Sequence, residues 1–560
     1  MRTFGRLTPK WTFSMASTSS SSRSTLANFV GLQGIATLNI IRNFLLVPIY
    51  LRHFGADLYG AWVAVLGMAA LVQLADLGVP RMLIQRTAAL HGVSDHLGLG
   101  RTAASGLVSL ALVTLALLGL LFPLAGWMTS VFGLTGPRAV LITEASRLVL
   151  LDGVLMLFVY GEAGVLLGLQ KPSQAMLSLI LGQLVGIVAT LVLLGQGISL
   201  PALPLGMLTG TGFALLPTTV ALIRCVRVEV PVGAFRCHGA TLRELLGSSI
   251  LLTLSRLSQV VTQQAPAVLA ATLLSPASAA VMDVSRKSSL LVADVVSRAS
   301  MSFHPDMAHR SGIGGEDFQR TGRLMLRATY LLGALGVGGV LAFNRGFVML
   351  WTGPHLYGGD LLTALLCAAT LLRLTGTAAF FILLAGGAER VLSLASLFEA
   401  IVQITLLVAL GHAFGLIGIA LGTTVSAAAG LAVQTPLLLR LINAEFPGRR
   451  DLPRIVRRTA AGFVPIVLGL SVPPIIGERG WWQFGLFAVA YLFVCAVAIT
   501  AIDPDIRPWA ARRIMAALEA ALAPLSVTQA STACGVRNVD HTIPVVEPLE
   551  VIKSNIRGGE

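Results

Sequence analysis

The chain has 560 residues, of which 55% are hydrophobic and 12% are charged, and its mean hydropathy is +0.81. This composition excludes an ordinary water-soluble globular protein. Its net charge of +14 would suggest nucleic acid as a partner in a soluble chain, but here the basic residues lie in alternate loops between apolar runs. Those runs, each of about 18 residues or more, can cross a hydrocarbon core about 30 Å thick. The alternation of a membrane β-barrel is absent, so we predict an all-α polytopic membrane protein with no nucleic-acid partner.

The apolar runs predict about fourteen transmembrane helices, arranged as two bundles of six and a final pair. The first bundle, 27–223, has helices expected near 27–51, 58–80, 104–128, 142–168, 174–196 and 200–223. The second bundle, 247–440, has helices expected near 247–273, 279–303, 328–349, 360–386, 392–411 and 414–438. The two additional helices of the region 459–502 are expected near 459–477 and 483–502. The even number places both termini on one side of the membrane.

The segments outside the helices differ in composition and indicate the orientation. A Ser-rich tail, two basic loops, an amphipathic interfacial helix and a disordered tail are expected, in chain order, at 1–26, 224–246, 441–458, 503–525 and 526–560. An amino terminus in the cytoplasm leaves about 26 basic residues in inner segments and about four in outer loops. We therefore expect both termini in the cytoplasm and the basic loops near anionic headgroups.

Motifs for catalysis and for metal binding are missing from the sequence. It has no phosphate-binding G-x-x-x-x-G-K-[ST] loop, no nucleophile elbow and no zinc signature. Five cysteines give no disulfide framework, and Cys225 and Cys237 lack two further metal ligands at usable spacing. We therefore expect no enzymatic activity, no cofactor and no metal site, and transport becomes the default function.

Ionisable residues inside the spans indicate a functional site, since each costs at least about 2.5 kcal/mol at membrane depth unless it faces protein or water. The helix at 279–303 carries five within a sector of about 120°. They are Asp283, Arg286, Lys287, Asp294 and Arg298. Asp283 with Lys287, and Asp294 with Arg298, have the i,i+4 spacing of ion pairs. A structural role for the two aspartates stays open, and the basic residues leave a positive surplus.

The helix at 247–273 is polar on one face and is interrupted by Pro266. Its polar residues are Thr253, Arg256, Gln259 and Gln263. Aligning "GIATLNIIRNF" (34–44) with "SSILLTLSRLS" (248–258) puts Arg42 and Arg256 in register, which indicates an internal duplication of the six-helix unit. We predict that cations of both halves meet in a watery cavity at mid-bilayer. The expected cavity residues are Arg42, Arg256, Lys287, Arg298, Asn39, Asn43, Gln259 and Gln263.

Other charges in the predicted spans have weaker assignments. Glu162, Glu399 and Asp294 are candidates for a titrating group that couples transport to an ion. Arg147 and Asp152 are expected to pair with one another.

The stretch "LLVPIYLRHFGADLYGAWVAVLGMAALVQLADLGVPRMLIQ" (45–85) resembles the start of polysaccharide-transporter proteins. These form the O-antigen (lipid-linked oligosaccharide) flippase family of the multidrug/oligosaccharidyl-lipid/polysaccharide exporter superfamily. The shared features are an Arg in the first helix, a Pro followed by Gly-x-x-x-Tyr-Gly (Gly55, Tyr59, Gly60), and Asp76-Leu77-Gly78 at the end of the second helix. The similarity of layout covers about residues 25 to 500, whereas residues match mostly in the first two helices. The loop after the sixth span and the tail beyond 503 show no family pattern.

The resemblance implies two six-helix bundles around a central cationic cavity, with two added helices, in the bacterial inner membrane. Such proteins move undecaprenyl-diphosphate-linked sugars outward for O-antigen, exopolysaccharide or capsule synthesis. Arg42 then matches the family's first-helix cation, and Arg256, Lys287 and Arg298 follow by helix position. The implied partners are the lipid-linked oligosaccharide, membrane lipids and the polysaccharide polymerase and chain-length machinery.

Two other functions stay open at this point. A cation-coupled multidrug exporter of the same superfamily would need an acidic, aromatic-lined cavity. A non-transporting scaffold of a glycan-assembly complex would use the basic loops and the interfacial helix.

Overall fold

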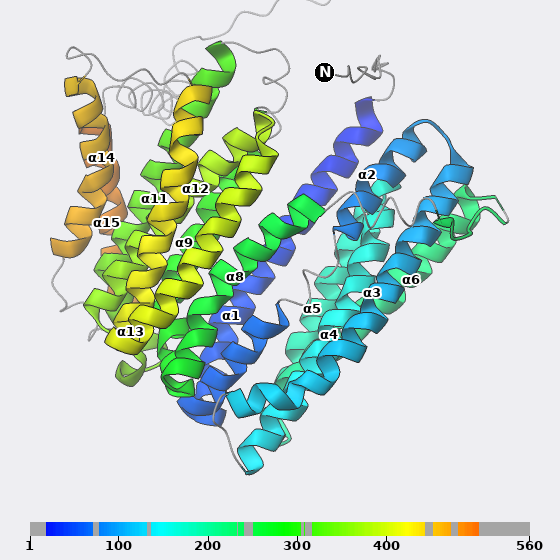
Figure 1. Ribbon diagram of the computed structural model, residues 1–560, viewed down its shortest axis with the longest axis horizontal. Coiled ribbons are helices and arrows are strands. Elements are labelled where there is room, and N and C mark those ends of the chain that lie inside the picture. The colour runs from blue at the N-terminus through cyan, green and yellow to red at the C-terminus, as the bar shows by residue number, and fades with distance from the viewer. Residues whose placement is uncertain are drawn as a thin grey trace, which may run out of the picture. The chain divides into compact units, whose positions relative to one another are not determined.

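The computed structural model describes residues 18–70, 78–131, 136–231, 233–239, 250–303, 307, 316–442, 452–471 and 480–502 (Figure 1). Every regular element in these residues is a helix. In chain order they are α1 (Thr18–Ala69), α2 (Val79–Gly92), α3 (His96–Val131), α4 (Pro137–Gly168), α5 (Pro172–Gly195), α6 (Ala202–Glu229), α8 (Ile250–Leu273), α9 (Pro276–Ser302), α11 (Glu316–Trp351), η2 (Pro354–Leu356), α12 (Asp360–Ala385), α13 (Glu389–Leu441), α14 (Leu452–Ser471) and α15 (Trp481–Ile502). The predicted all-α polytopic class is confirmed.

Several predicted features lie outside the described residues. They are Asp76, parts of the two basic loops, most of the Ser-rich tail, the interfacial helix at 503–525 and the tail at 526–560.

Helix α13 contains two predicted spans, and α1 contains one predicted span and most of the next. The backbone inside α1 is left-handed at Gly55 (φ 75°), and inside α13 at Gly415 (φ 60°). Glycine adopts this conformation without the steric penalty of a Cβ atom, so the chain changes direction there without a separate loop. By length and composition, nine of the described helices can cross a membrane, and α1 and α13 are among them. The polar helices α8 and α9 are not.

The second predicted span, 58–80, is divided between two helices. α1 ends at Ala69, and α2 begins at Val79 directly after Gly78, whose φ is 73°. Pro80 lies in the first turn of α2, where its missing N–H leaves no helical hydrogen bond unmade. The apolar run predicted one continuous helix, whereas the structure places its two ends in different helices.

The helices pack as two groups, α1–α6 and α8–α13, with α1 also in contact with α8 and α9. In the first group α5 packs along α6, and α4 packs against α2, α3 and α6. In the second, α13 packs against α8 and α12. Figure 1 shows α1 (blue) running beside the green helices of the second group. We call these groups the first half and the second half.

The two halves share one apolar cluster where α1 meets α9. It includes Val47 and Trp62 of α1 and Met282 of α9. Gly60 lies so close to α9 that a Cβ atom there would overlap the carbonyl oxygen of Pro276. A small residue at this position therefore sets the distance between the halves.

Polar contacts support the same interface. The hydroxyl of Tyr59 donates a hydrogen bond to Asp283 Oδ2 at 2.8 Å, and Trp351 Nε1 donates to the carbonyl oxygen of Phe44 at 2.8 Å. The first bond has a carboxylate acceptor, a class that contributes about 1.5–3 kcal/mol.

The last two helices pack on the second half through α11. Tyr491 of α15 donates its hydroxyl to the carbonyl oxygen of Pro465 in α14 at 3.0 Å, and its ring meets Phe343 of α11 edge to face. The remaining faces of α15 are apolar and exposed, including Trp482 at 86%. Such faces suit contact with lipid.

We expect Gly60→Val to lower the thermal unfolding midpoint of the purified protein. The added side chain must push α1 away from Pro276, and overpacking of this kind costs about 1–3 kcal/mol. Gly119→Val is the matched control, because nothing lies within 4 Å of a Cβ atom at Gly119 and both changes place a β-branched residue in a helix. Equal midpoints for the two variants would contradict the close contact between the halves.

Candidate functional site

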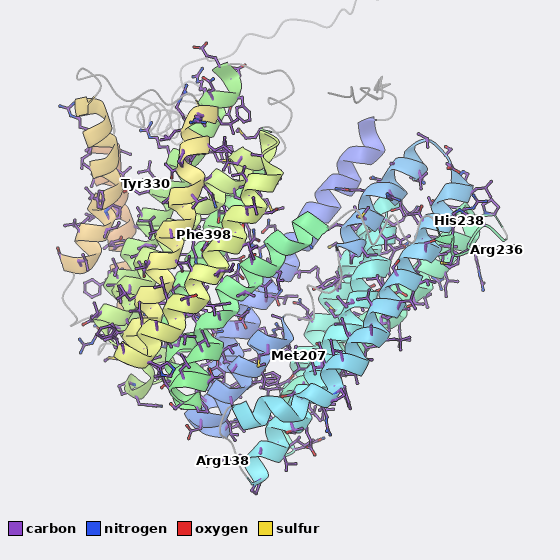
Figure 2. The ribbon with its side chains drawn as sticks, viewed as in Figure 1. Arg138, Met207, Arg236, His238, Tyr330 and Phe398 are labelled. Carbon is purple, nitrogen blue, oxygen red and sulfur yellow. The ribbon has the colours of Figure 1, made fainter. Side chains whose placement is uncertain are left out.

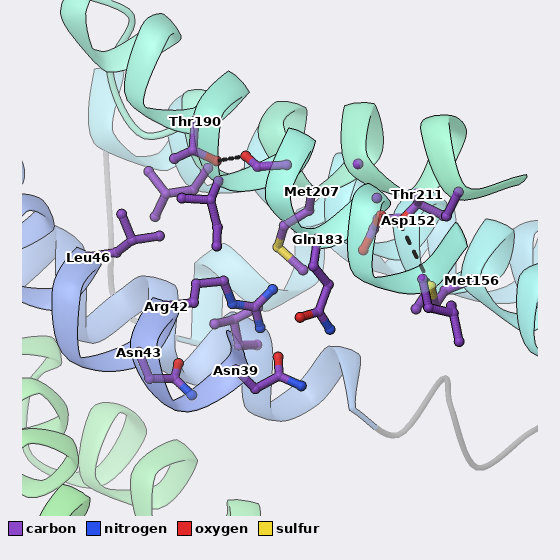
Figure 3. A pocket seen from close by; sticks show the side chains of 18 of the residues that line it. Asn39, Arg42, Asn43, Leu46, Asp152, Met156, Gln183, Thr190, Met207 and Thr211 are labelled. Atoms are coloured by element: carbon purple, nitrogen blue, oxygen red, sulfur yellow. Dashed lines mark hydrogen bonds between the residues drawn. The ribbon is translucent and has the colours of Figure 1, made fainter. Parts of the chain in front are cut away.

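A cavity of about 360 Å³ lies within the first half (Figure 3). Every residue that lines it comes from α1, α4, α5 or α6. The polar and aromatic members are Asn39, Arg42, Asn43, Tyr50, Trp62, Asp152, Tyr160, Gln183, Thr190 and Thr211. The volume falls within the range of small-molecule pockets.

Helical periodicity places these side chains on facing surfaces. Asn39, Arg42 and Asn43 follow i, i+3, i+4 spacing and so share one face of α1. On α4, Asp152 and Tyr160 are two turns apart and share a face in the same way. The cavity is therefore bounded by one polar face of α1 and one of α4.

Glycines bring the other two walls together. A Cβ atom at Gly186 of α5 would lie 3.1 Å from the carbonyl oxygen of Gly206 in α6 and 3.4 Å from the Cα of Gly210. Small residues let helix backbones approach closely. This contact fixes the positions of Gln183 on α5 and Thr211 on α6, which both face the cavity.

Arg42 supplies the positive charge of the cavity. Among the described residues, its guanidinium has no carboxylate within 4 Å and no hydrogen-bond acceptor. Figure 3 shows the Arg42, Asn39 and Gln183 side chains converging from α1 and α5. An unpaired cation away from bulk water is costly, so this arrangement is suited to an anionic ligand.

Acceptor groups lie across the same cavity. Asp152 is 6% exposed and accepts a hydrogen bond from Thr211 Oγ1 at 2.6 Å. The side-chain oxygen of Gln183 is buried without a hydrogen-bond partner. The predicted pairing of Arg147 with Asp152 is wrong, because Arg147 instead lies over the ring of Phe122, 5.4 Å from its centroid. The cavity thus offers one cation with amide donors and, opposite, oxygens that can accept from hydroxyl groups.

The predicted cations of the second half do not line this cavity. Arg256 lies on α8, with Gln259 and Gln263 exposed on the same helix. Lys287 Nζ lies 3.1 Å from Asp283 Oδ2, and Arg298 Nε lies 3.0 Å from Asp294 Oδ2. Both predicted i,i+4 pairs are confirmed. The structure brings Asn39, Arg42 and Asn43 together but not these with the residues of α8 and α9.

Asp283 is the centre of the polar stripe of α9. It is 3% exposed and accepts from Tyr59 of the first half, and its two carboxylate oxygens lie near two cations. Besides Lys287, Arg286 Nε lies 3.8 Å from Asp283 Oδ1 and Arg286 Nη1 donates to the carbonyl oxygen of Gln263 at 2.9 Å. The two aspartates of the stripe thus offset two of its three positive charges, and Arg286 also has a backbone carbonyl as an acceptor.

Pro266 of α8 explains a second network. Proline has no N–H, so the carbonyl of Thr262 loses its helical donor. Arg373 Nη1 and Gln403 Nε2 donate to that oxygen instead, at 3.2 and 2.9 Å. Arg373 Nε also lies 3.8 Å from Glu399 Oε1. Glu399, a candidate coupling residue, therefore has a structural partner in the second half.

Glu162, another candidate for coupling, lies on α4 but does not line the cavity. It is 7% exposed, and Thr219 Oγ1 lies 2.9 Å from both of its carboxylate oxygens. The side chain of Thr253 lies outside the described residues. No metal-binding cluster of His, Cys, Asp or Glu occurs among the residues that the structure describes.

The sequence missed Asp152, Tyr160 and Gln183 as cavity residues. The i, i+8 spacing of Asp152 and Tyr160 was a signal for a shared face, but it could not show that this face meets the one around Arg42. Gln183 and Thr190 are seven residues apart in a mostly apolar helix and so share a face, but this spacing could not show that the face meets α1.

The arrangement of helices is that of known membrane transporters. The sequence matches no protein-family model and no curated protein. Solved structures do match. A multidrug resistance MATE family transporter of the MOP superfamily, in an inward-facing conformation, has a TM-score of 0.62 at 17% identity, covering 73% of this chain and 96% of that one.

The lipid II flippase MurJ, in an inward closed conformation, has a TM-score of 0.61 at 14% identity, covering 86% of this chain and 98% of that one. A MOP superfamily transporter from Pyrococcus furiosus, whose reverse polarity of the binding pocket is described as suggesting a different function, has a TM-score of 0.53 at 16% identity, covering 75% and 96%. The chain therefore has the fold of MOP superfamily transporters.

We expect Arg373→Leu to destabilise the protein by about 2–3 kcal/mol, less than the loss of a fully buried partner. The change leaves Glu399 without its cation, removes the donor to Gln403 Oε1 and removes one of the two donors to the carbonyl oxygen of Thr262. The double variant Arg373→Leu/Glu399→Leu should lose less, since it leaves no orphaned carboxylate. Thermal unfolding in detergent measures both. A double variant as unstable as the single one would show that the pair is not the source of the loss.

Proposed function

We propose that the protein is a flippase that moves a polyprenyl-diphosphate-linked oligosaccharide from the cytoplasmic to the outer leaflet of the bacterial inner membrane. Its product would serve O-antigen, exopolysaccharide or capsule synthesis. The observation that carries the proposal is Arg42, a cation without a carboxylate partner among the described residues, which lies between Asn39 and Asn43 in a cavity inside the first half.

A diphosphate suits this surface because it needs cations or amide donors to replace its water. The planar guanidinium of Arg42 can donate two parallel hydrogen bonds to phosphate oxygens, and the amides of Asn39 and Asn43 can add single ones. Across the cavity, Asp152 and Gln183 offer acceptors that fit sugar hydroxyls. The polyprenyl chain would stay in lipid.

The cations of the second half would complete the site during transport. In alternating access, one bundle moves against the other around the ligand. Arg256 would join Arg42 in that movement, while Lys287 and Arg298 would exchange their aspartates for phosphate. Gln259 and Gln263 would add hydrogen bonds, and Asp294, Glu162 and Glu399 remain candidates for coupling. Similarity to MurJ, described as a lipid II flippase, supports this substrate class.

A second candidate is export of an organic cation. It is favoured by Asp152, the one carboxylate that lines the described cavity, and by the aromatic rings of Tyr50, Trp62 and Tyr160 around it. Aromatic faces and a carboxylate attract cations. Similarity to MATE multidrug transporters supports this alternative. The two candidates differ in the residue they require, Arg42 for the lipid diphosphate and Asp152 for the cation.

We expect Arg42→Gln to slow translocation of lipid-linked oligosaccharide by at least about tenfold, because it removes one charge-assisted contact with the substrate. The measurement is transfer of labelled lipid-linked sugar across reconstituted vesicles. Arg147→Gln is the matched control, since Arg147 is also an arginine of the first half but lies on Phe122 outside the cavity. Translocation that survives Arg42→Gln while Asp152→Asn abolishes drug efflux would replace the proposal with the second candidate.

The membrane potential provides a test that needs no mutation. Moving two negative charges outward is downhill by about 4.6 kcal/mol per 100 mV when the inside is negative. A potassium gradient with valinomycin can make the interior of the vesicles negative. For protein whose cytoplasmic side faces the interior, we therefore expect the rate of outward flipping to rise. A rate that falls under this potential would fit an exported cation instead.

A further inference from the structure

A second cavity lies outside the site around Arg42, at the end of the first half where α2 turns into α3. Its volume is about 370 Å³. Three parts of the chain supply its basic side chains: Arg86 on α2, Arg101 on α3 and His238 on the segment after α6. Figure 2 shows His238 and Arg236 on this segment, near the ends of α3 and α6.

The segment after α6 is fixed in place rather than resting on the surface. The backbone N–H of His238 donates to Ser105 Oγ of α3 at 2.9 Å. Ala234 is 6% exposed and belongs to the same apolar cluster as Leu99. The cavity is therefore preformed, because its third wall is held by both a hydrogen bond and core packing.

Among the described residues, two acids at this end of the first half have contacts of their own. Asp95 Oδ1 accepts from the backbone N–H of Gly98 at 2.9 Å and so caps the start of α3. Glu229 Oε2 lies 3.3 Å from His91 Nδ1. Arg101 is exposed and, among the described residues, has no carboxylate within 4 Å. Arg101 therefore adds a positive charge to the cavity that no described carboxylate neutralises.

We propose that this cavity binds a phosphate group through Arg86, Arg101 and His238. Guanidinium groups match phosphate oxygens in geometry and charge, and an imidazole N–H can add a third donor. The rim favours a lipid as the source, since Val93 and Leu97 beside the α2–α3 turn are 63% and 54% exposed and can contact acyl chains. The site is separate from the cavity around Arg42 and does not depend on the proposed function.

Titration of the full-length protein with phosphatidic acid, followed by native mass spectrometry, tests the site. We expect Arg101→Gln to weaken binding about tenfold or more, as loss of a charge-assisted hydrogen bond does, and Arg101→Lys, which keeps the charge but loses the fork, to weaken it less. Arg236→Gln is the matched control, because it removes the same charge from the same segment as His238 without lining the cavity. If Arg101→Gln does not fold, His238→Gln carries the same expectation.

Two further arms identify the source of the phosphate. In the first outcome, phosphatidic acid raises the thermal unfolding midpoint, inorganic phosphate does not, and Arg101→Gln loses the effect. This outcome assigns the site to a lipid. In the second outcome, inorganic phosphate also raises the midpoint, and Arg101→Gln again loses the effect. This outcome supports the site and shows that it binds soluble phosphates as well as lipids. Two outcomes would overturn the proposal. In one, phosphatidic acid and inorganic phosphate bind Arg101→Gln and His238→Gln as tightly as they bind the unchanged protein. In the other, Arg236→Gln weakens binding as much as Arg101→Gln does.

Discussion

A charge inside the bilayer must find a partner in the protein or water, and the two halves of this chain meet that constraint differently. In the second half, Asp283 lies beside Lys287 and Arg286 and offsets part of their charge, while Glu399 lies beside Arg373. In the first half no such pairing occurs around Arg42 among the described residues, and a cavity lies next to it instead. The same physical cost therefore produces a closed polar network in one half and a ligand-sized space in the other.

The interface between the halves depends on the closed network. Asp283 is held on α9 by its cations, and the hydroxyl of Tyr59 reaches it from α1. Beside this bond, Gly60 allows the backbones of the two halves to touch at Pro276. A polar contact and a steric one thus lie within one turn of α1. Any movement of the first half away from the second would have to break both contacts.

Helix class and element order followed from the sequence because membrane depth requires long apolar runs, which hydropathy records directly. The pairs Asp283–Lys287 and Asp294–Arg298 were equally accessible, since i,i+4 spacing is local. Asp152 was assigned to the wrong partner because its neighbours come from α6, 59 residues away. The position of Asp152 in the fourth predicted span indicated that this residue is buried. It gave no information about which helix would face Asp152.

The sequence by itself determined that the protein is an all-α membrane protein and which of its helices are polar. It also placed Arg42 in an apolar helix, where a charge is costly unless it faces protein or water. Only the tertiary structure decided which charges remain unpaired. It directed Arg373 to the carbonyl that Pro266 leaves free, and left Arg42 facing the oxygens of Asp152 and Gln183. The physical reason is that hydropathy and periodicity are properties of one helix, whereas neutralisation depends on distances between atoms of helices far apart in the chain.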